Sequence, residues 1–249
     1  MKLLEAKDLS KSYALGEHAV EALKSVNFSV GKGEFVAIMG PSGSGKSTLM
    51  HLLGGLDNPS SGEVYLSDKA LSNLSRKELT LTRRHNVGFV FQFFNLIPTL
   101  SAEENIILPI IIDGKKPKEY EDRLNKLLEL IGLSDRRDHR PDQLSGGEQQ
   151  RVAVGRALIT NPAILLADEP TGNLDSKTGR EIMRLLQKSC NELEQTVIVV
   201  SHDPRAAAYA NRIVFLRDGN IVNEMSFSKT KKIEEKLDMI LEQMRKLEF

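Results

Sequence analysis

The chain has 249 residues, with 34 Lys and Arg against 34 Asp and Glu, so its formal net charge is zero. Hydrophobic residues make up 40% and charged residues 27%, which is typical of a globular protein with a buried core and excludes a disordered or fibrous one. The neutral charge excludes long-range attraction to nucleic acid or anionic lipid. The single cysteine, Cys190, excludes an internal disulfide and a cysteine-rich zinc site and indicates a reducing compartment.

The first part of the chain predicts strands followed by a helix. Apolar residues alternate over 4–9 and again over 26–30, which favours half-buried strands. The run 35–39 is apolar without alternation, as in a parallel strand buried on both faces. After a Gly/Ser-rich loop, leucines recur at helical spacing over 49–56. The order strand, loop, helix is therefore expected here.

A change of character is predicted between residues 62 and 160. Residues 62–91 indicate further short strands and a basic, polar connection, in which the run Arg83-Arg84-His85 is expected to be a solvated surface. From residue 93 to 160 the pattern is mostly helical, and residues 117–132 carry apolar side chains at i, i+3, i+4 and i+7.

Strand signals return in the last third of the chain. Apolar runs at 164–167, 197–200 and 213–216 are separated by helical or turn segments, which indicates that a βαβ architecture resumes. The tail from Lys229 onward is different, because apolar residues from Ile233 to Leu247 step by four and three in a charged background. A helix packed on its own domain is expected, with a regulatory or dimer-stabilising helix as the alternative.

No stretch of the sequence predicts a membrane span. The most apolar one, 106–112, has seven residues and is interrupted by Pro109, whereas a spanning helix needs about 20. We therefore expect the chain to serve a membrane only through a partner.

The loop after the first buried strand has the pattern G-x-x-x-x-G-K-[ST] at residues 40–47. Its glycines permit backbone conformations in which consecutive N–H groups converge on phosphate oxygens, and the following helix N-terminus adds positive field. Lys46 would place its charge at the β- and γ-phosphates, Ser47 would offer its hydroxyl to Mg²⁺, and Thr48 would reach the α-phosphate. A chance match is expected in about 1 of 100 such chains before the flanking strand and helix are demanded. The predicted ATP-binding residues of this loop are Gly40, Pro41, Ser42, Gly43, Ser44, Gly45, Lys46, Ser47 and Thr48.

Two adjacent acids, Asp168 and Glu169, follow the apolar run 164–167. They would stand at the carboxyl end of a parallel strand, where open α/β sheets bind ligands. Asp168 would hold Mg²⁺, directly or through water, and Glu169 would orient and deprotonate the attacking water. Such a pair alone is more often a solvated strand end, so the phosphate loop is what favours the nucleotide interpretation.

The motif Leu144-Ser145-Gly146-Gly147-Glu148-Gln149-Gln150-Arg151 is similar to the signature motif of the ATP-binding subunits of ABC transporters. The chain resembles this family from about residue 1 to residue 225. The resemblance implies an α/β P-loop NTPase of ABC type, with a mainly parallel sheet core, an N-terminal antiparallel β subdomain and a helical subdomain insert. The implied division is an ABC ATP-binding domain at 1–228, with a RecA-like core at 1–92 and 161–228 and a helical subdomain at about 93–160, followed by a C-terminal amphipathic helix at 229–249.

The resemblance also assigns site residues by their order along the chain. Tyr13 falls at the adenine-stacking position, and Gln92 is the Q-loop glutamine that would contact Mg²⁺ or the lytic water. His202 is the switch histidine, which would hydrogen-bond the γ-phosphate, and Asp175 belongs to the D-loop, Asn173-Leu174-Asp175. Taken singly, Tyr13 and His202 would be an ordinary surface aromatic and a strand-end histidine. The signature residues that would bind a γ-phosphate through a hydroxyl, N–H groups and a helix N-terminus are Ser145, Gly146, Gly147 and Glu148.

The implied assembly is a head-to-tail dimer, in the first place a homodimer, with two ATP molecules sandwiched. Each would lie between the phosphate loop of one subunit and the signature motif of the other, and hydrolysis would favour opening. The dimer would sit at the cytoplasmic face of the cell membrane, peripheral through an integral membrane permease, and no nucleic-acid partner is expected. Side chains that form either a groove for a permease helix or core packing between subdomains are Phe93, Phe94, Leu96, Ile97, Pro98 and Leu100.

Segments 88–98 and 168–175 resemble most the subgroup of macrolide-export, lipoprotein-release, antimicrobial-peptide-resistance and cell-division ATPases. The implied function is an ATP-hydrolysing subunit that powers a membrane ABC transporter through ATP-driven dimerisation. The alternative is a mechanotransmission or signalling ATPase without substrate translocation, and the two share their machinery. A DNA-repair ATPase is disfavoured, because 53 positions from Gln92 to Ser145 (145 minus 92) leave no room for a long coiled-coil insertion.

Overall fold

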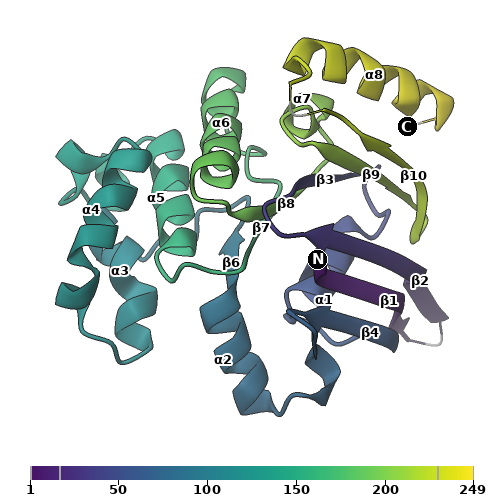
Figure 1. Ribbon diagram of the computed structural model, residues 1–249, viewed down its shortest axis with the longest axis horizontal. Coiled ribbons are helices and arrows are strands. Elements are labelled where there is room, and N and C mark those ends of the chain that lie inside the picture. Colours follow the sequence, from purple (N-terminus) through teal and green to yellow (C-terminus); the bar gives the residue numbers. More distant parts are fainter. Residues whose placement is uncertain (1, 17, 229, 249) are drawn as a thin grey trace.

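The computed structural model describes residues 2–16, 18–228 and 230–248 and arranges them in two sheets with helices around them. Figure 1 shows the larger sheet through the middle, the smaller one on one side, and helices α3, α4 and α5 together on the other. The chain therefore has the predicted α/β organisation with a helical insert. The boundaries at residues 92 and 160 stay a prediction, and residues 229 and 249, the ends of the predicted C-terminal segment, lie outside the described residues.

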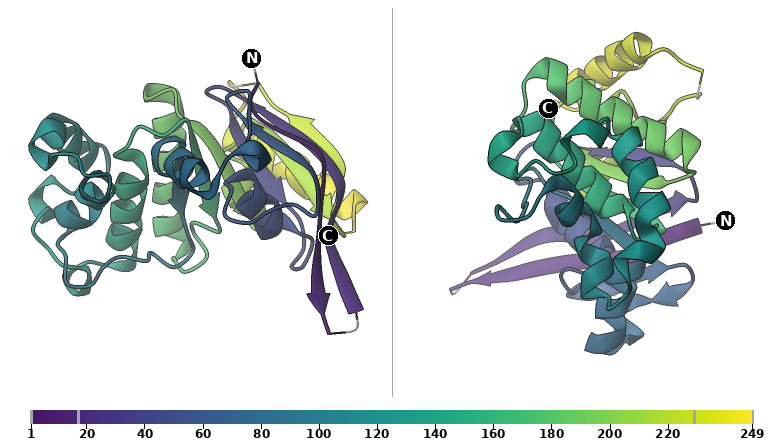
Figure 2. Two further views of the ribbon diagram at one scale, coloured as in Figure 1. Left: turned by 90° about the horizontal axis from the view of Figure 1, so that it is seen from below. Right: turned by 90° about the vertical axis from the view of Figure 1, so that its left-hand side faces the viewer.

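The smaller sheet is antiparallel and comes from the N-terminal part of the chain, in the order β2-β1-β4-β5. Leu4, Ala6 and Leu9 of β1 are buried, and the period of two between the first two is the predicted alternation. The long β1–β2 hairpin projects beyond the body of the molecule (Figure 2). The strands are β1 (Lys2–Leu15), β2 (His18–Gly31), β4 (Ser61–Leu66) and β5 (Lys69–Ala70).

The larger sheet has six strands in the order β10-β9-β3-β8-β7-β6. β10 pairs antiparallel with β9, and the pairs from β9 to β6 are parallel. Parallel strands end at one edge of the sheet, where open α/β sheets bind ligands. The strands are β3 (Phe35–Met39), β6 (Val87–Val90), β7 (Ile164–Asp168), β8 (Thr196–Ser201), β9 (Arg212–Arg217) and β10 (Asn220–Ser226).

Two hydrophobic cores lie on the two faces of the larger sheet. Leu49 and Leu53 of α1 share one core with Leu4 and Val36, so α1 packs between the sheets. The other core joins the sheet to α3–α8. The α-helices are α1 (Lys46–Leu53), α2 (Arg76–Asn86), α3 (Ala102–Ile112), α4 (Glu121–Leu130), α5 (Gly146–Leu158), α6 (Ser176–Glu192), α7 (Pro204–Ala207) and α8 (Ile233–Lys246). Short 3₁₀ helices lie at Leu71–Asn73, Pro117–Tyr120, Ser134–Arg136 and Pro141–Gln143.

The basic connection between the predicted strands is a helix, α2, which differs from the prediction. It begins with a capping box, in which the Ser75 N–H donates to Glu78 Oε2 at 2.8 Å and the Glu78 N–H donates to Ser75 Oγ at 3.3 Å. α2 buries none of its residues and so lacks the apolar stripe by which a helix is recognised. Its basic end, expected to be a solvated surface, is partly exposed and also forms ion pairs, because Arg84 and His85 contact the carboxylate of Asp113 at 3.1 and 2.9 Å.

The helical middle and the tail follow their predictions. The most apolar stretch of the sequence lies in α3, where Ile106 and Ile110 are buried in the core. None of the helices in the described part of the chain is long and apolar enough to cross a bilayer. The tail forms α8, which packs on its own chain with Ile240 fully buried.

Candidate functional site

The loop between β3 and α1 has a backbone that only glycine can supply at key positions. Gly43 and Gly45 have φ angles of 79° and 101°, in the left-handed region. A Cβ on Gly40 would lie 2.0 Å from the carbonyl oxygen of Leu216, so this glycine allows close approach to β9. The N-terminal N–H groups of α1, which have no partner one turn earlier in the helix, point into the loop as an anion-binding nest.

Lys46 is held inside this loop. Its Nζ donates to the carbonyl oxygens of Gly40 at 2.9 Å and Pro41 at 2.8 Å. Burial lowers the pKa of Lys46, and the carboxylates of Glu169 and Asp168 partly oppose that shift. The ammonium is thus poised where a phosphate oxygen can take the place of the loop carbonyls.

A cavity of about 630 Å³ opens over the loop. It brings together the phosphate loop, an acid from the end of β7 and a histidine from the end of β8, which are far apart in the sequence. The cavity is lined by Ala22, Gly40, Pro41, Ser42, Gly43, Gly45, Lys46, Ser47, Thr48, Glu169, His202 and Met244. Ser44 is not in the lining; its hydroxyl is buried without a hydrogen-bond partner among the described residues.

Ser47, which lines the cavity, is hydrogen-bonded to Asp168 just behind the lining. The Ser47 hydroxyl donates to Asp168 Oδ1 at 3.2 Å. Burial raises the pKa of Asp168, although this hydrogen bond opposes the shift. A hydroxyl and a carboxylate at this distance are hard oxygen donors of the kind that Mg²⁺ prefers. The two residues therefore fit the metal that the sequence predicts beside the phosphates.

Glu169 and His202 form a hydrogen-bonded pair at the open side of the cavity. His202 Nδ1 lies 2.8 Å from Glu169 Oε1, and the Ser201 hydroxyl donates to the other carboxylate oxygen at 3.4 Å. The Glu169 N–H donates to the carbonyl of Val200, and its φ of 45° is left-handed, so the β7–β8 pairing holds it in an uncommon conformation. The side chain of His202 is 70% exposed. A carboxylate is thus fixed next to the predicted phosphate position.

Gln92 is placed beside the D-loop and outside the cavity lining. Gln92 Nε2 donates to Asn173 Oδ1 at 3.0 Å, and Asn173 Nδ2 donates to the backbone carbonyl of Gln92 at 3.2 Å. A Cβ on Gly172 would lie 2.8 Å from Gln92 Nε2, so the glycine makes room for this pair. The contact joins the end of β6 to the loop after Glu169, which is a connection that sequence order alone does not give.

Tyr13 lies on the β1–β2 hairpin next to the cavity. Its hydroxyl donates to Asp57 Oδ2 at 2.9 Å, and the Lys11 ammonium lies 4.9 Å from the ring centroid. Lys11 also pairs with Asp57 at 2.8 Å. Partial burial and the bond to Asp57 raise the pKa of Tyr13, and a hydrogen bond with Thr48 of α1 acts in the opposite direction. Tyr13, which is 39% exposed, is therefore tied to Asp57 in the segment that follows α1.

The signature residues stand apart from the cavity. Ser145 caps α5 with a capping box, in which its N–H donates to Glu148 Oε2 at 2.8 Å and the Glu148 N–H donates to the Ser145 hydroxyl oxygen at 3.3 Å. Gly146 and Gly147 form the first turn of the helix. Figure 1 shows α5 and α1 well separated, and none of the four signature residues lines the cavity. Within one chain the phosphate loop and the signature motif do not form one site.

Asp175 acts as the N-cap of α6. Its Oδ1 accepts from the N–H groups of Lys177 at 2.9 Å and Thr178 at 3.1 Å, and the Thr178 hydroxyl donates to Oδ2. These hydrogen bonds, that of the Thr178 hydroxyl first, lower the pKa of Asp175. The carboxylate is thus engaged in holding the end of the D-loop.

Sequence reasoning missed Ala22 and Met244 in the cavity lining and two residues beside it, Lys11 and Asp57. Lys11 and Asp57 orient Tyr13, but they lie 46 positions apart and belong to no motif. Met244 lines the cavity from the C-terminal tail, and no local pattern indicates contact with a loop some 200 residues earlier. Only the folding of α8 onto the sheet brings it there.

Comparison with known proteins gives consistent matches. A family profile described as ABC transporter matches residues 23–172. The uncharacterized ABC transporter ATP-binding protein MJ0796 of Methanocaldococcus jannaschii is 49% identical over 226 residues, covering 89% of this chain and 96% of the relative. The macrolide export ATP-binding/permease protein MacB of Chlorobaculum tepidum is 48% identical over 222 residues, covering 89% of this chain but 34% of the relative.

Solved structures agree in fold. A dimeric post-hydrolysis state of the ATP-binding cassette MJ0796 bound to ADP and Pi matches with a TM-score of 0.82 at 47% identity, covering 90% of this chain and 99% of that one. The cbiO1 subunit of Clostridium perfringens, described as part of the transporter complex cbiONQ, matches with a TM-score of 0.84 at 29% identity, covering 99% of this chain and 94% of that one.

Proposed function

The chain belongs to the ATP-binding subunits of ABC transporters and is an ATPase; from this premise we propose that it drives an exporting membrane complex by ATP-dependent dimerisation. The export direction is proposed from the relatives described as macrolide export ATP-binding/permease proteins, of which this chain spans about a third. Those relatives are described as ATP-binding/permease proteins, so the proposed partner of this chain is a separate integral membrane permease. Through it, the chain would lie at the cytoplasmic face of the membrane.

Residues in and around the cavity have proposed tasks in hydrolysis. The loop N–H groups and Lys46 would bind the β- and γ-phosphates, and Ser47 and Asp168 would hold Mg²⁺. Gln92 would contact Mg²⁺ or the lytic water. The metal neutralises phosphate charge when bound. Glu169 takes the proton of the attacking water, and His202 and Ser201 fix its carboxylate in place.

The positions of Tyr13, Thr48 and Asp175 also suggest tasks for them: contacts with the adenine and the α-phosphate, and support of the D-loop. Tyr13, oriented by Asp57, would stack on the adenine, and Thr48 would contact the α-phosphate. Asp175 would fix the D-loop as the cap of α6, so its contribution to the nucleotide site is through Asn173 and Gln92.

The observation that carries the dimer proposal is the separation of the two halves of the site. His202 lines the cavity and is 70% exposed, so the γ-phosphate side is open in one chain. Ser145 and the N-terminus of α5 offer a hydroxyl and a positive helix end, but they lie away from that side. A second copy, turned head to tail, would close the cavity with this helix end.

The proposed permease contact is a groove of about 440 Å³ beside α2 and α3. Its walls include Phe89, Leu108 and the exposed Ile112, 59% accessible. The apolar segment predicted for this role is divided, since Phe93 is 69% exposed whereas Leu96 packs against the core. An amphipathic cytoplasmic helix of the permease is the proposed occupant, because an apolar groove of this kind accepts one helix face.

Trapping the bound state tests the proposal. Glu169→Gln keeps the shape of the side chain but removes the base, so we expect it to bind MgATP, turn over at least about 100-fold more slowly and sediment as a dimer. The matched control is Glu169→Gln with Lys46→Ala, which should remain monomeric because the phosphate contact is lost. A monomeric Glu169→Gln chain at saturating MgATP would contradict dimerisation, and retained turnover would contradict the role of Glu169.

A further inference from the structure

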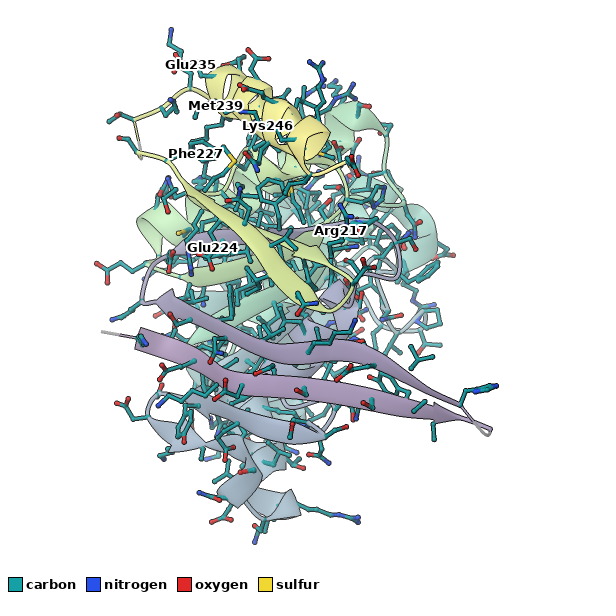
Figure 3. All side chains as sticks on the ribbon, turned by 90° about the vertical axis from the view of Figure 1, so that its right-hand side faces the viewer. Arg217, Glu224, Phe227, Glu235, Met239 and Lys246 are labelled. Carbon is teal, nitrogen blue, oxygen red and sulfur yellow. The ribbon has the colours of Figure 1, made fainter. Side chains whose placement is uncertain are left out.

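Helix α8 is the part of the molecule to which the proposed function assigns no task. It follows β10 and folds back over α7 and the sheet (Figures 1 and 3), with Phe227 in the connection that leads to it. Ile240 is fully buried, and Leu237, Met244 and Leu247 pack against the core that contains β3 and α7. The helix is therefore an integral part of the domain.

A buried lysine anchors the first half of α8. Lys236 is 2% exposed, and its Nζ donates to the carbonyl of Ala210, just beyond α7, at 2.8 Å. The ammonium also lies 5.7 Å from the ring centroid of Phe227, which is a favourable cation–π distance. Burial lowers the pKa of Lys236. These contacts fix α8 to the segment that follows His202.

A second anchor fixes the C-terminal end of α8. Arg217 Nη1 donates to the carbonyl of Leu247 at 2.6 Å. Arg217 is the last residue of β9, and the parallel neighbour β3 ends in the phosphate loop at the same edge of the sheet. The last turn of α8 is thereby held beside that loop, and Met244 in this turn lines the cavity together with Pro41, Gly43 and His202.

We propose that α8 forms one wall of the ATP cavity. The side chain of Met244 would cover the bound nucleotide beside the phosphate loop and so slow its dissociation. This inference rests on the cavity being the ATP site. An apolar wall displaces water from beside the phosphates, which strengthens their contacts with Lys46 and the loop N–H groups. A methionine suits this position, because its flexible thioether side chain adapts to the shape of what it contacts.

The chain supplies a matched control on the same helix. Met239 is the same residue type and is 39% exposed. It lies five positions before Met244, which places it about 140° around the helix from it. Figure 3 labels Met239 on α8 together with Glu235 and Lys246. The two methionines differ in position and share their chemistry.

The test is the dissociation rate of a fluorescent ADP, carrying an N-methylanthraniloyl group on the ribose, measured by stopped flow on the full chain. We expect Met244→Ala to release it about 4- to 15-fold faster, the effect of losing one or two methylene-sized contacts. Met244→Leu should restore the slow release, and Met239→Ala should release at the original rate. Lys236→Met, which removes the anchor and keeps the volume of the side chain, should also accelerate release.

The outcomes separate this inference from the function on which it rests. Equal release rates for Met244→Ala, Met239→Ala and the unchanged chain would overturn the wall while leaving the ATP site in place. If the unchanged chain did not bind the fluorescent ADP, both the site and the wall would be overturned. Thermal unfolding of each variant shows that the comparison is made on folded protein, since Met244 lies at the rim of the core.

Discussion

Asp168 occupies a position that costs the folded protein free energy. Burial raises its pKa above the unfolded value, so the folded state holds the proton more tightly than the unfolded state. The stability from this group is fully present below the unfolded pKa and is lost as the pH rises through the folded pKa. At neutral pH the ionised carboxylate of Asp168 therefore lowers the stability of the folded protein. Metal binding together with Ser47 would explain why a destabilising residue stands at this position.

Asp168→Asn should consequently stabilise the protein and inactivate it. We expect the melting temperature without nucleotide at pH 7 to rise by about 1–3 °C, because a partly screened carboxylate contributes less than about 1 kcal/mol. The Mg²⁺-dependent ATPase rate should fall by at least about 100-fold, since an amide is a weaker ligand for Mg²⁺. Differential scanning fluorimetry and a phosphate-release assay measure the two effects.

Asp175→Asn is the comparison at the residue scale. Hydrogen bonds lower the pKa of Asp175, so its stability is present above the unfolded pKa and is lost as the pH falls through the folded one. Loss of this charge should lower the melting temperature, although asparagine also caps helices. A lower melting temperature for Asp168→Asn would show that its carboxylate stabilises the folded chain and would contradict the expected sign.

At the scale of elements, the contact between α2 and α3 depends on one carboxylate. The side chain of Asp113 is 7% exposed and pairs with Arg84 and His85 at the end of α2 and with Lys115 at 2.8 Å. The hydrogen bonds of Lys115, His85 and Arg84 hold the pKa of Asp113 well below its usual range. α2 buries none of its own residues fully, and its other contacts are the packing of Leu79 on the core and a hydrogen bond from Arg83 to the Gly55 carbonyl at 2.8 Å. The Asp113 contacts are therefore a large part of what holds its C-terminal end beside the groove.

Asp113→Ala should loosen α2 without unfolding the chain. We expect amide hydrogen exchange to become about 10-fold faster in residues 76–86, which corresponds to a free energy of local opening lower by about 1.4 kcal/mol. The exchange rates of α6 should not change. Hydrogen exchange with mass spectrometry resolves the two segments. The control is Glu242→Ala, because this carboxylate pairs with exposed Lys246 at 2.6 Å on one helix. Unchanged exchange of α2 would mean that the packing of Leu79 and the hydrogen bond of Arg83 to Gly55 hold it without Asp113.

The same helix shows what limits the prediction of elements from sequence. Strands β3, β7 and β8 are predicted because each is an apolar run buried on both faces, and α8 because its apolar residues recur at helical spacing. α2 has a capping box as its sequence signal but no apolar stripe. Its partner Asp113 lies 28 or more positions away, so only the tertiary structure shows why this helix is kept in place.

At the scale of the whole molecule, sequence motifs predict those parts of the candidate site whose residues are neighbours in the sequence. The phosphate loop and the pair Asp168-Glu169 come together with His202 because parallel strands end at one edge. The contact of Gln92 with Asn173 and the approach of Met244 depend on how loops and α8 pack. Such contacts follow from packing between distant segments, for which the sequence carries no local signal.

The largest arrangement that the sequence implies is a site shared between two chains, and mixing two defective chains tests it. In a head-to-tail dimer, Lys46→Ala removes the phosphate contact and Ser145→Arg places a bulky cation at the N-terminus of α5, where positive charge is unfavourable. A mixed dimer still has one site with Lys46 from one chain and Ser145 from the other. With Glu169→Gln in both chains to prevent turnover, we expect MgATP to join donor-labelled Lys46→Ala to acceptor-labelled Ser145→Arg.

Energy transfer between the labels measures this complementation. Each variant labelled with both dyes and tested alone should give no ATP-dependent transfer, because every site in its dimers lacks one half. The mixture should give transfer that disappears when Lys46→Ala is introduced into the second chain as well. A site contained within one chain predicts no gain on mixing, since each chain would stay defective, so absence of transfer in the mixture would place the signature residues outside the ATP site.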